Sequence, residues 1–238
     1  MLGLSAELLL GAYAVGMFPM ADDYHDPTIH WIEPRRRAVF PLDRFHLPRS
    51  LRKSLRRGRC VLRVDTDFEA VIRACAEPTP NRPSTWLNPE LIGLYLELHR
   101  RGHAHSVETW QGGHLVGGLY GVRLGGAFFG ESMFSRVTDA SKMALVELVG
   151  RLRAGGFALL DAQFMTAHLR RFGAVEISRA EYLARLRRAL PAAARFPAEP
   201  YPFWPAVAGG SGGGTGGDAG GGASSVSMGS AHSITQTS

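Results

Sequence analysis

At residues 130–135 the sequence reads Gly-Glu-Ser-Met-Phe-Ser, which sets one carboxylate, that of Glu131, among apolar side chains. The stretch ends a glycine-rich run of expected strands over residues 115–129. Glycine inside a strand lets another backbone or a ligand approach closely. Farther along, residues 159–163 read Leu-Leu-Asp-Ala-Gln, the pattern of a buried strand that ends in two polar groups. We therefore expect the two carboxylates and the amide to converge with apolar side chains on one cleft.

The elements around these stretches indicate an α+β fold with a mixed, largely antiparallel sheet. Residues 105–129 alternate as strands joined by a Gly-Gly turn, which predicts an antiparallel meander. A helix follows, with Asp139 as its expected cap and apolar residues at helical spacing to Leu152, and a strand over 157–163 returns to the sheet. A short helix, another strand and a last helix, which opens at the capping box of residues 178–181, complete the layers.

Three further helices with recognisable cap residues are expected upstream. Ser5 is a typical cap for the first of them. Either Asp65 or Thr66 is the expected cap of a second helix, which carries apolar residues at helical spacing. A third begins at Asn88-Pro89, a cap followed by proline at the first helical position, and ends at Gly102.

Composition indicates a reduced protein that has an anionic partner and does not span a membrane. The chain has 238 residues, a formal net charge of +6 and two cysteines, Cys60 and Cys75. The basic excess suggests an anionic partner, and the cysteines have neither motif spacing nor a disulfide framework, so we expect a reduced protein without a metal site. The apolar run at residues 8–10 is too short to span a membrane, and Glu7 stands where a signal peptide would carry basic residues. A cytoplasmic protein with no membrane partner is expected.

Most of the basic residues gather in one run. Residues 35–63 contain eleven cations and a single acid, Asp43. On a helix over residues 50–57, Leu51 and Leu55 share one face and the cations occupy the rest. Such an array suits sequence-independent contact with phosphates. A merely solvated face is the alternative, although the near absence of acids disfavours it.

Several aromatic and apolar residues allow two interpretations. The corner Met17-Phe18-Pro19-Met20 is typical of packing, but it also suits one wall of a ligand site. Trp31 is a core aromatic or a stacking surface. Trp86 lies at a junction between a loop and a helix, where burial and stacking on a base are equally favoured by the sequence.

Several motifs resemble the leucyl/phenylalanyl-tRNA–protein transferase family, in order, from about Leu8 to Leu190. They are Gly16-Met17-Phe18-Pro19, residues 45–50 (Phe-His-Leu-Pro-Arg-Ser), Thr85-Trp86, residues 103–108 (His-Ala-His-Ser-Val-Glu), residues 115–121, residues 130–135, Ala140-Ser141-Lys142 and residues 160–163. The resemblance implies a catalytic domain of the GNAT acyltransferase type over residues 49–205, behind a small amino-terminal α/β domain over residues 1–48. Residues 206–238 are rich in Gly, Ser, Ala and Thr and read as a disordered tail with no assigned function.

The resemblance also implies an activity. Members transfer leucine or phenylalanine, and less well methionine, from aminoacyl-tRNA to the N-terminal α-amine of proteins that begin with arginine or lysine, which marks those proteins for degradation. The donor ester is already activated, and an amine with a pKa of roughly 8 is partly neutral at pH 7. We therefore expect no cofactor and no metal, and the expected partners are Leu-tRNA, Phe-tRNA and proteins with N-terminal Arg or Lys.

Three residues of this chain match the family's active site: Glu131, Asp161 and Gln163. Our hypothesis gives the proton step to Asp161, directly or through Gln163, whose amide donates to the oxyanion or fixes the incoming amine. Glu131 would bind the donor's free ammonium or hold the acceptor amine. From the residues alone, Asp161 is as well explained as a strand-end cap and Glu131 as half of a buried ion pair.

The resemblance assigns three more sets of residues. An apolar pocket for the donor side chain maps onto Leu119, Phe128, Met133, Leu152 and Leu160. The 3′-adenosine of the tRNA is expected to stack on Trp86. Many members carry tryptophan where this sequence has Met20, so the resemblance implies that a second stacking wall is weaker here or is supplied by Trp31. The phosphates of the tRNA are assigned to Arg49, Lys53, Arg56 and Arg57.

The sequence is compatible with two other functions. A GNAT enzyme that uses an acyl coenzyme A would cradle a pyrophosphate with a glycine-rich turn at a helix start. Residues 136–140 contain no glycine and place an acid at the cap, which disfavours that substrate. A non-catalytic RNA-binding module would use the basic helix alone and would not depend on Asp161.

Overall fold

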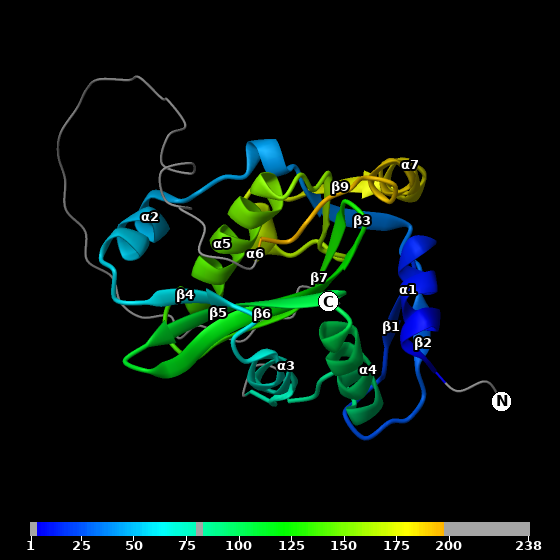
Figure 1. Ribbon diagram of the computed structural model, residues 1–238, viewed down its shortest axis with the longest axis horizontal. Coiled ribbons are helices and arrows are strands. Elements are labelled where there is room, and N and C mark those ends of the chain that lie inside the picture. Colours follow the sequence, from blue (N-terminus) through cyan, green and yellow to red (C-terminus); the bar gives the residue numbers. More distant parts are fainter. Residues whose placement is uncertain (1–3, 80–82, 198–238) are drawn as a thin grey trace.

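The computed structural model describes residues 4–79 and 83–197 and builds them around a seven-stranded sheet (Figure 1). The strand order is β4-β5-β6-β7-β8-β3-β9, and a separate two-stranded sheet pairs β1 with β2. Every pair of neighbours is antiparallel except β7 and β8, so the predicted α+β fold with a largely antiparallel sheet is confirmed. The strands are β1 (Phe18–Met20), β2 (His30–Ile32), β3 (Arg36–Phe40), β4 (Val61–Val64), β5 (Ala104–Gln111), β6 (His114–Leu124), β7 (Ala127–Ser135), β8 (Leu159–Asp161) and β9 (Val175–Ser178).

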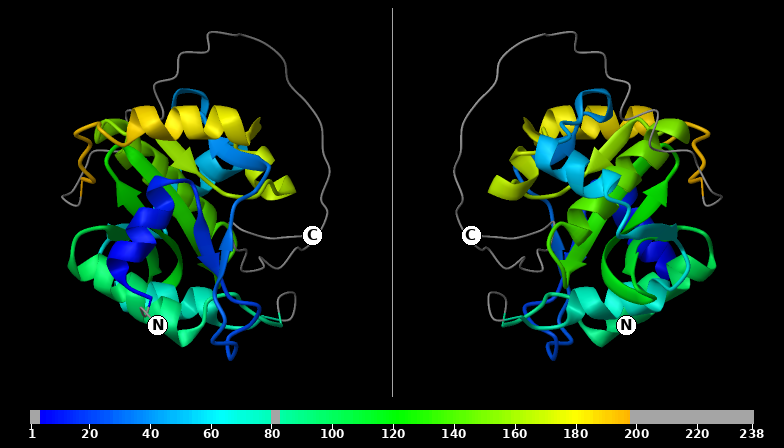
Figure 2. Two further views of the ribbon diagram at one scale, coloured as in Figure 1. Left: turned by 90° about the vertical axis from the view of Figure 1, so that its right-hand side faces the viewer. Right: turned by 90° about the vertical axis from the view of Figure 1, so that its left-hand side faces the viewer.

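Helices cover both faces of the large sheet, with α2 and α5 on one side and α3 and α4 on the other (Figure 1). Neighbouring strand residues point to opposite faces. Phe129 and Leu159 therefore pack in a core with α1, α3, α4 and α7, while Phe128 and Leu160 pack in a second core under α5. Figure 2 shows α7 and α3 at opposite ends of the molecule. The helices are α1 (Ala6–Ala14), η1 (Leu42–Arg44), α2 (Arg49–Arg56), α3 (Phe68–Ala76), α4 (Pro89–Arg100), α5 (Ala140–Ala154), α6 (Ala167–Arg170) and α7 (Arg179–Ala189).

The predicted caps of α1 and α4 are confirmed, but those of α3 and α5 differ. Asp67, rather than Asp65 or Thr66, caps α3 by accepting a hydrogen bond from the Ala70 N–H. Asp65 adopts a left-handed conformation and accepts instead from the backbone of β5. At α5, Asp139 occupies the cap position with a φ of 68°, so its side chain makes no capping bond.

Two strand glycines explain how closely the layers approach. A Cβ at Gly117 of β6 would collide with Ala140 at the start of α5, and a Cβ at Gly121 would collide with the carbonyl of Phe129 on β7. These two glycines therefore serve the approach of neighbouring elements, which was one of the two uses that the sequence allowed.

The strands β7 and β8 part next to Glu131 and Asp161. They pair from Ala127 with Leu159 to Phe129 with Asp161, after which β7 continues alone to Ser135. On the other edge of β7 the pairing with β6 shifts, because Gly121 faces Gly130 while Tyr120 faces Ser132. Glu131 is therefore the extra residue of a β-bulge, a device that re-aims a side chain.

Residues 1–48, the expected amino-terminal domain, contribute strands to both sheets. β3 falls within residues 1–48 and is nevertheless a strand of the large sheet, whereas β1 and β2 form their own small sheet. The predicted tail, residues 206–238, lies outside the described residues. Among the described helices, none combines the length and the apolar character that crossing a membrane requires.

Candidate active site

Asp161, the last residue of β8, is fully buried, and its carboxylate accepts hydrogen bonds from four donor groups. Arg37 donates through Nε at 2.9 Å and through Nη2 at 2.6 Å. The hydroxyl of Tyr182 donates at 2.8 Å and the backbone N–H of Gln163 at 2.9 Å. An ionised carboxylate has about four acceptor positions, so those of Asp161 are filled from within the protein.

Arg37 is the cation of this cluster. It lies on β3, beside β8, and only 1% of its side chain is exposed. It also donates to the carbonyl oxygen of Gly16 at 3.1 Å and lies over the rings of Phe18 and Tyr182, at 4.6 and 4.5 Å from their centroids. Although burial by itself lowers the pKa of Arg37, the adjacent carboxylate of Asp161 outweighs burial and holds that pKa above its ordinary value. Arg37 thus joins the corner after α1 to β8 and α7.

Glu131 is the second fully buried carboxylate of this site, and phenols rather than a cation hold it. Tyr13 of α1 donates to Oε1 at 2.7 Å, and Tyr95 of α4 donates to Oε2 at 3.1 Å. Burial raises the pKa of Glu131 to about 7, the two phenols oppose that rise, Asp161 adds to it and Arg37 opposes it. A carboxyl group with such a pKa can both accept and release a proton near neutrality.

Gln163 lies between the two carboxylates. Its backbone has a φ of 53°, a left-handed conformation that costs a residue other than glycine about 1–2 kcal/mol. Its N–H is held by Asp161, and its side-chain Nε2 lies 3.4 Å from Oε1 of Glu131. Its Oε1 is buried and has no hydrogen-bond partner. The structure therefore brings Glu131, Asp161 and Gln163 together, as the sequence predicts.

Four partners of these residues were not identified from the sequence: Arg37, Tyr13, Tyr95 and Tyr182. Arg37 was included in the basic run that was expected to face phosphates, and for this residue that interpretation is wrong. The available signal was period-two alternation, because Arg37 shares a strand face with Val39, which is buried. The tyrosines carried no signal beyond helical spacing, since their partners lie far away in the sequence.

The five residues assigned to the donor pocket lie on the opposite face of the sheet. All five are buried in the core under α5, together with Phe157 and Met143. Phe128 and Met133 of β7 flank Glu131 in sequence, and Leu160 precedes Asp161 in β8. The same two strands therefore carry the apolar set on one face of the sheet and the two carboxylates on the other.

The three residues assigned to the adenosine lie on the face with α1 and α4. Trp86 is buried, with 7% of its surface exposed, and its carbonyl accepts from the Ala21 N–H at 3.1 Å. This is the burial alternative that the sequence left open. Met20 and Trp31 are partly buried, and Trp31 lines an apolar cavity of about 330 Å³ against α1.

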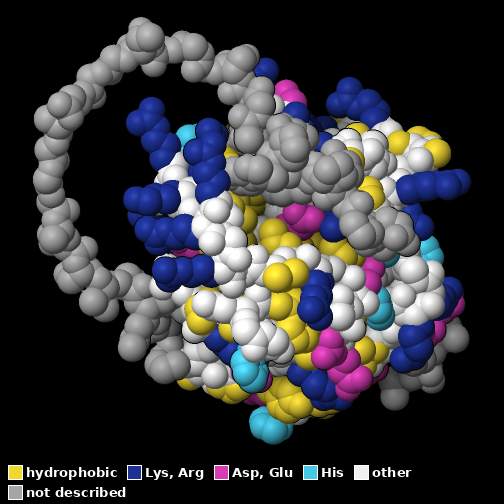
Figure 3. Space-filling view, turned by 60° about the vertical axis from the view of Figure 1, so that its left-hand side comes forward, with side chains coloured by type: hydrophobic (Ala, Val, Ile, Leu, Met, Phe, Trp, Pro, Cys, Tyr) yellow, Lys and Arg dark blue, Asp and Glu magenta, His cyan; other side chains and the backbone are white. Residues whose placement is uncertain are grey.

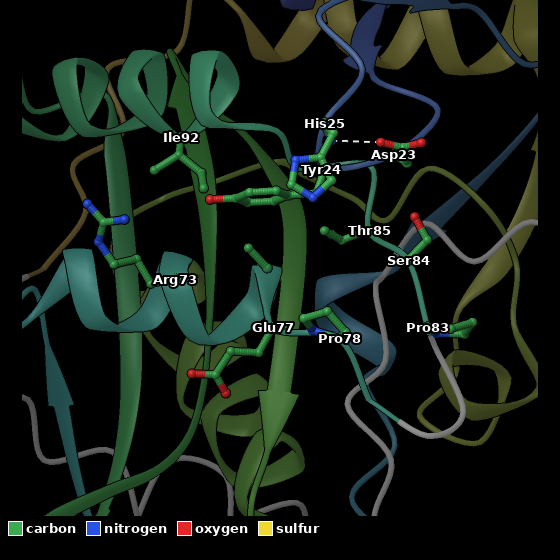
Figure 4. Close-up of a pocket in the computed structure, with 11 residues that line it drawn as sticks. Asp23, Tyr24, His25, Arg73, Glu77, Pro78, Pro83, Ser84, Thr85 and Ile92 are labelled. Carbon is green, nitrogen blue, oxygen red and sulfur yellow. Dashed lines mark hydrogen bonds between the residues drawn. The ribbon is translucent and has the colours of Figure 1, made fainter.

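A larger pocket of about 610 Å³ is lined in part by Pro83, Ser84 and Thr85, which precede Trp86 in the sequence (Figure 4). Its lining includes Thr85 and Ile92 together with Tyr24 and His25, whose rings lie 5.2 Å apart. Neither Glu131 nor its two partners line it. Within residues 4–79 and 83–197, no group of three or more His, Cys, Asp or Glu side chains is placed to hold a metal ion.

The cations of α2 form the basic surface that the sequence predicts. Leu51 anchors the helix in the core under α5, and the helix contains no acidic residue. Figure 3 shows Lys and Arg side chains gathered over this part of the molecule. The four exposed cations assigned to tRNA phosphates are Arg49, Lys53, Arg56 and Arg57.

Comparison with protein families gives two adjoining matches. Residues 39–187 match the family model described as leucyl/phenylalanyl-tRNA protein transferase. Residues 3–35 match the model of the N-terminal domain of the same family. Together the two matches include β7, β8, the part of α7 that carries Tyr182, and α1, which carries Tyr13, whereas Arg37 of β3 lies in the gap at residues 36–38.

Individual relatives agree with these matches. The chain is 59% identical to the leucyl/phenylalanyl-tRNA–protein transferase of Paramagnetospirillum magneticum over 193 residues, which are 81% of this chain and 92% of that protein. It is 57% identical to the protein of the same name from Ruegeria pomeroyi over 197 residues, 83% of this chain and 92% of that protein. The protein of that name from Rhizorhabdus wittichii is 56% identical over 190 residues, 80% of this chain and 77% of that protein.

Proposed function

Because the chain belongs to the leucyl/phenylalanyl-tRNA–protein transferase family, we infer that it is an aminoacyltransferase. It moves leucine or phenylalanine from aminoacyl-tRNA to the N-terminal α-amine of a protein, so that a peptide bond forms and the tRNA leaves. The new N-terminal residue marks the acceptor protein for degradation. The family match over most of the chain carries this conclusion.

The chemistry requires little activation. The donor is an ester, and the enzyme has to hold it at attack distance from a neutral amine, remove one proton and stabilise the oxyanion. We propose that Glu131, Asp161 and Gln163 form the active site where β7 and β8 part. The unpartnered Oε1 of Gln163 supports this proposal, because a buried acceptor without a donor suits an incoming N–H group.

The donor side chain would enter the apolar residues under α5. Leu119, Phe128, Met133, Leu152 and Leu160 are proposed as its pocket because all are buried in one cluster. An apolar pocket discriminates by only about 1–3 kcal/mol per methylene group. Methionine would therefore be accepted as a poorer donor than leucine or phenylalanine.

The tRNA would be held from two sides. The phosphates of the acceptor stem are proposed to contact Arg49, Lys53 and Arg56 on α2 and Arg57 directly after it, which are all exposed, and α2 contains no acidic residue. The 3′-adenosine is proposed to lie near Trp86, Met20 and Trp31. Stacking on an aromatic ring contributes about 1–3 kcal/mol per base, and the burial of Trp86 leaves Trp31 as the more accessible ring.

The acceptor and the cellular setting follow from the family resemblance. We propose that acceptor proteins begin with arginine or lysine. The reaction needs neither a cofactor nor a metal, because the ester supplies the driving force. We place it in the cytoplasm, where charged tRNA and newly exposed protein N-termini meet.

The fold supports a finer proposal. Two parallel strands that part inside a mixed sheet are a GNAT-like feature, and we propose a GNAT-like catalytic domain over residues 49–205 behind a smaller one over residues 1–48. The competing acyl coenzyme A reaction is disfavoured by the turn before α5. There the turn contains no glycine, and Asp139 at the cap position pairs with Lys142 at 2.7 Å, so neither a glycine-rich cradle nor an unpaired lysine is offered to a diphosphate.

The direct test is transfer of radiolabelled leucine from leucyl-tRNA to a peptide that begins with arginine, beside the same peptide N-acetylated. Wild type should label the free peptide only. Gln163→Ala should reduce transfer by about 100-fold or more. Gln111→Ala, the same change at an exposed position of β5, is the matched control and should transfer as wild type does.

The alternatives give different results. If wild type binds tRNA in a salt-sensitive manner but transfers none of leucine, phenylalanine and methionine, the protein is an RNA-binding module. If the peptide is acylated from an acyl coenzyme A, the chain is an ordinary acyltransferase. Either result would overturn the proposed reaction.

A further inference from the structure

The two buried carboxylates beside Gln163 differ in what holds them. Asp161 receives both arms of a guanidinium, a phenol and a backbone N–H. Glu131 receives two phenols and, at 3.4 Å, the side-chain amide of Gln163. One carboxylate is neutralised by a buried cation, and the other is not.

Resting on the proposed function, we propose that Glu131 accepts the proton from the acceptor amine and that Asp161, Arg37 and Tyr182 are positioning residues that hold Gln163. This division differs from the one expected from the sequence, which gives the proton step to Asp161.

Asp161 is a poor proton acceptor in this arrangement for two reasons. Protonating it would leave the guanidinium of Arg37 buried without a counter-charge, and breaking a buried ion pair from one side is strongly unfavourable. Its four acceptor positions are also occupied, so a substrate proton would have to displace an internal donor.

Glu131 meets the requirements that Asp161 does not. The groups that face it are Tyr13 from α1, Tyr95 from α4, Gln163 after β8, and, farther away, Asp161 and Arg37. Burial dominates these effects and raises its pKa to about 7. That value is close to the pKa of roughly 8 of an α-amine, so proton transfer between the two groups is nearly balanced.

Gln163 would hold the amine beside that base. Its backbone is fixed twice, because its N–H donates to Asp161 and its carbonyl accepts from the Ala38 N–H at 3.0 Å. This anchoring holds the left-handed backbone from which the side chain reaches toward Glu131. An amine N–H that donates to the free Oε1 of Gln163 would leave its other hydrogen directed at the carboxylate of Glu131.

The step balances in protons and charge. The neutral amine attacks the ester carbonyl, a C–N bond forms, and the nitrogen becomes positively charged. Glu131 takes one proton from that nitrogen. The bond from the carbonyl carbon to the 3′-oxygen of the tRNA breaks, and that oxygen takes the proton from Glu131, which returns to its anionic state. The products are an amide and a tRNA with a free hydroxyl.

The test is the pH dependence of kcat at saturating leucyl-tRNA and arginyl peptide, supported by carboxyl ¹³C titration of Glu131 by NMR. Wild type should show a rising limb near pH 7. Glu131→Gln should lose this limb and reduce kcat by about 100- to 10,000-fold. Asp161→Asn should keep the limb and move it to lower pH, because an anion that raises the pKa of Glu131 is removed.

Asp161→Asn leaves the buried cation of Arg37 without a counter-charge, which destabilises the fold. The double variant Arg37→Met with Asp161→Asn therefore provides the second measurement. It removes both charges together. We expect the limb to stay near its wild-type pH, the KM for peptide to stay within about twofold, and kcat to fall about 10- to 100-fold because Gln163 loses its anchor.

Three outcomes would overturn the assignment. The first is a limb that persists in Glu131→Gln and disappears in the double variant, which would make Asp161 the base. The second is recovery of Glu131→Gln with a donor whose α-amine is replaced by hydroxyl, which would make Glu131 a binding group for the donor ammonium. The third, no transfer by wild type at all, would overturn the proposed function as well.

Discussion

Arg37 and the cations of α2 belong to one basic run of the sequence, yet they lie in opposite environments. Arg37 is 1% exposed, contacts a carboxylate at 2.6 Å and is covered by two aromatic rings. Lys53 of α2 and Arg57, the residue that follows the helix, are exposed, and α2 contains no acidic residue. Both regions use positive charge, but only the first has lost the water that would screen it.

The difference shows where charge contributes to stability and where it contributes to binding. A buried ion pair is costly to break from one side, because the remaining charge has no solvent to stabilise it. Exposed cations add little to folding and are available to a polyanion. Four changes test this contrast, starting with the largest expected effect.

Arg37→Met should have the largest effect, because it leaves Asp161 buried without its cation. We expect the free energy of unfolding to fall by about 3–5 kcal/mol in urea titration at pH 7. Adding Asp161→Asn should recover a substantial part of that loss, since both charges are then absent. A single-variant loss below about 1 kcal/mol would show that the pair is hydrated in solution.

Glu131→Gln should have the second-largest effect, which is seen in the pH dependence of the free energy of unfolding. The pKa of Glu131 in the folded state, about 7, lies above its ordinary value of 4.5. Between these values the folded protein keeps a proton that the unfolded chain has released, so this group makes stability fall as pH rises from about 4.5 to about 7. Across that window, the stability of wild type relative to the variant should fall by about 3 kcal/mol.

The measurement is a set of urea titrations of both proteins between pH 4 and pH 8. Using the difference between the two proteins cancels the contribution of the other ionisable groups to the pH dependence. A constant difference across the window would mean that Glu131 keeps an ordinary pKa, and the assignment of Glu131 as proton acceptor would lose its support.

Much of the fold could be predicted from the sequence because its signals are local. Alternation and a Gly-Gly turn predict the meander of β5, β6 and β7, and Ser5 and Asn88 mark helix starts. The cap of α3 was misplaced because Asp65, Thr66 and Asp67 are all suitable cap residues. Contacts with β5 distinguish them, and those contacts depend on tertiary structure.

The site could be predicted only in part, for a similar reason. The resemblance identified Glu131, Asp161 and Gln163, but not the groups that set their charge states. Arg37 reaches Asp161 across 124 positions of sequence, and Tyr13 reaches Glu131 across 118. Such pairs follow from strand order and register, which no local pattern contains.

Arg36→Ala tests the contrast between neighbours in one strand. Arg36 lies beside Arg37 but points to solvent, and its ion pair with Glu176 at 3.1 Å is 59% and 40% exposed on its two sides. We expect the free energy of unfolding to change by about 0–1 kcal/mol. A loss comparable to that of Arg37→Met would show that position in β3, rather than burial of the charge, determines the cost.

The double change Lys53→Ala with Arg57→Ala on α2 should have the smallest effect on folding and a clear effect on binding. Stability should change by less than about 0.5 kcal/mol, because neither side chain is buried. If each cation contacts one phosphate, the slope of log K for tRNA against log salt should decrease by about 0.7–0.9 per contact. Filter binding between low and moderate salt measures that slope. Arg187→Ala with Arg188→Ala on α7 removes the same charge from another exposed surface and should leave the slope unchanged. Equal decreases in the two double variants would mean that tRNA responds to net charge alone, and the contrast between a binding helix and the rest of the surface would fail.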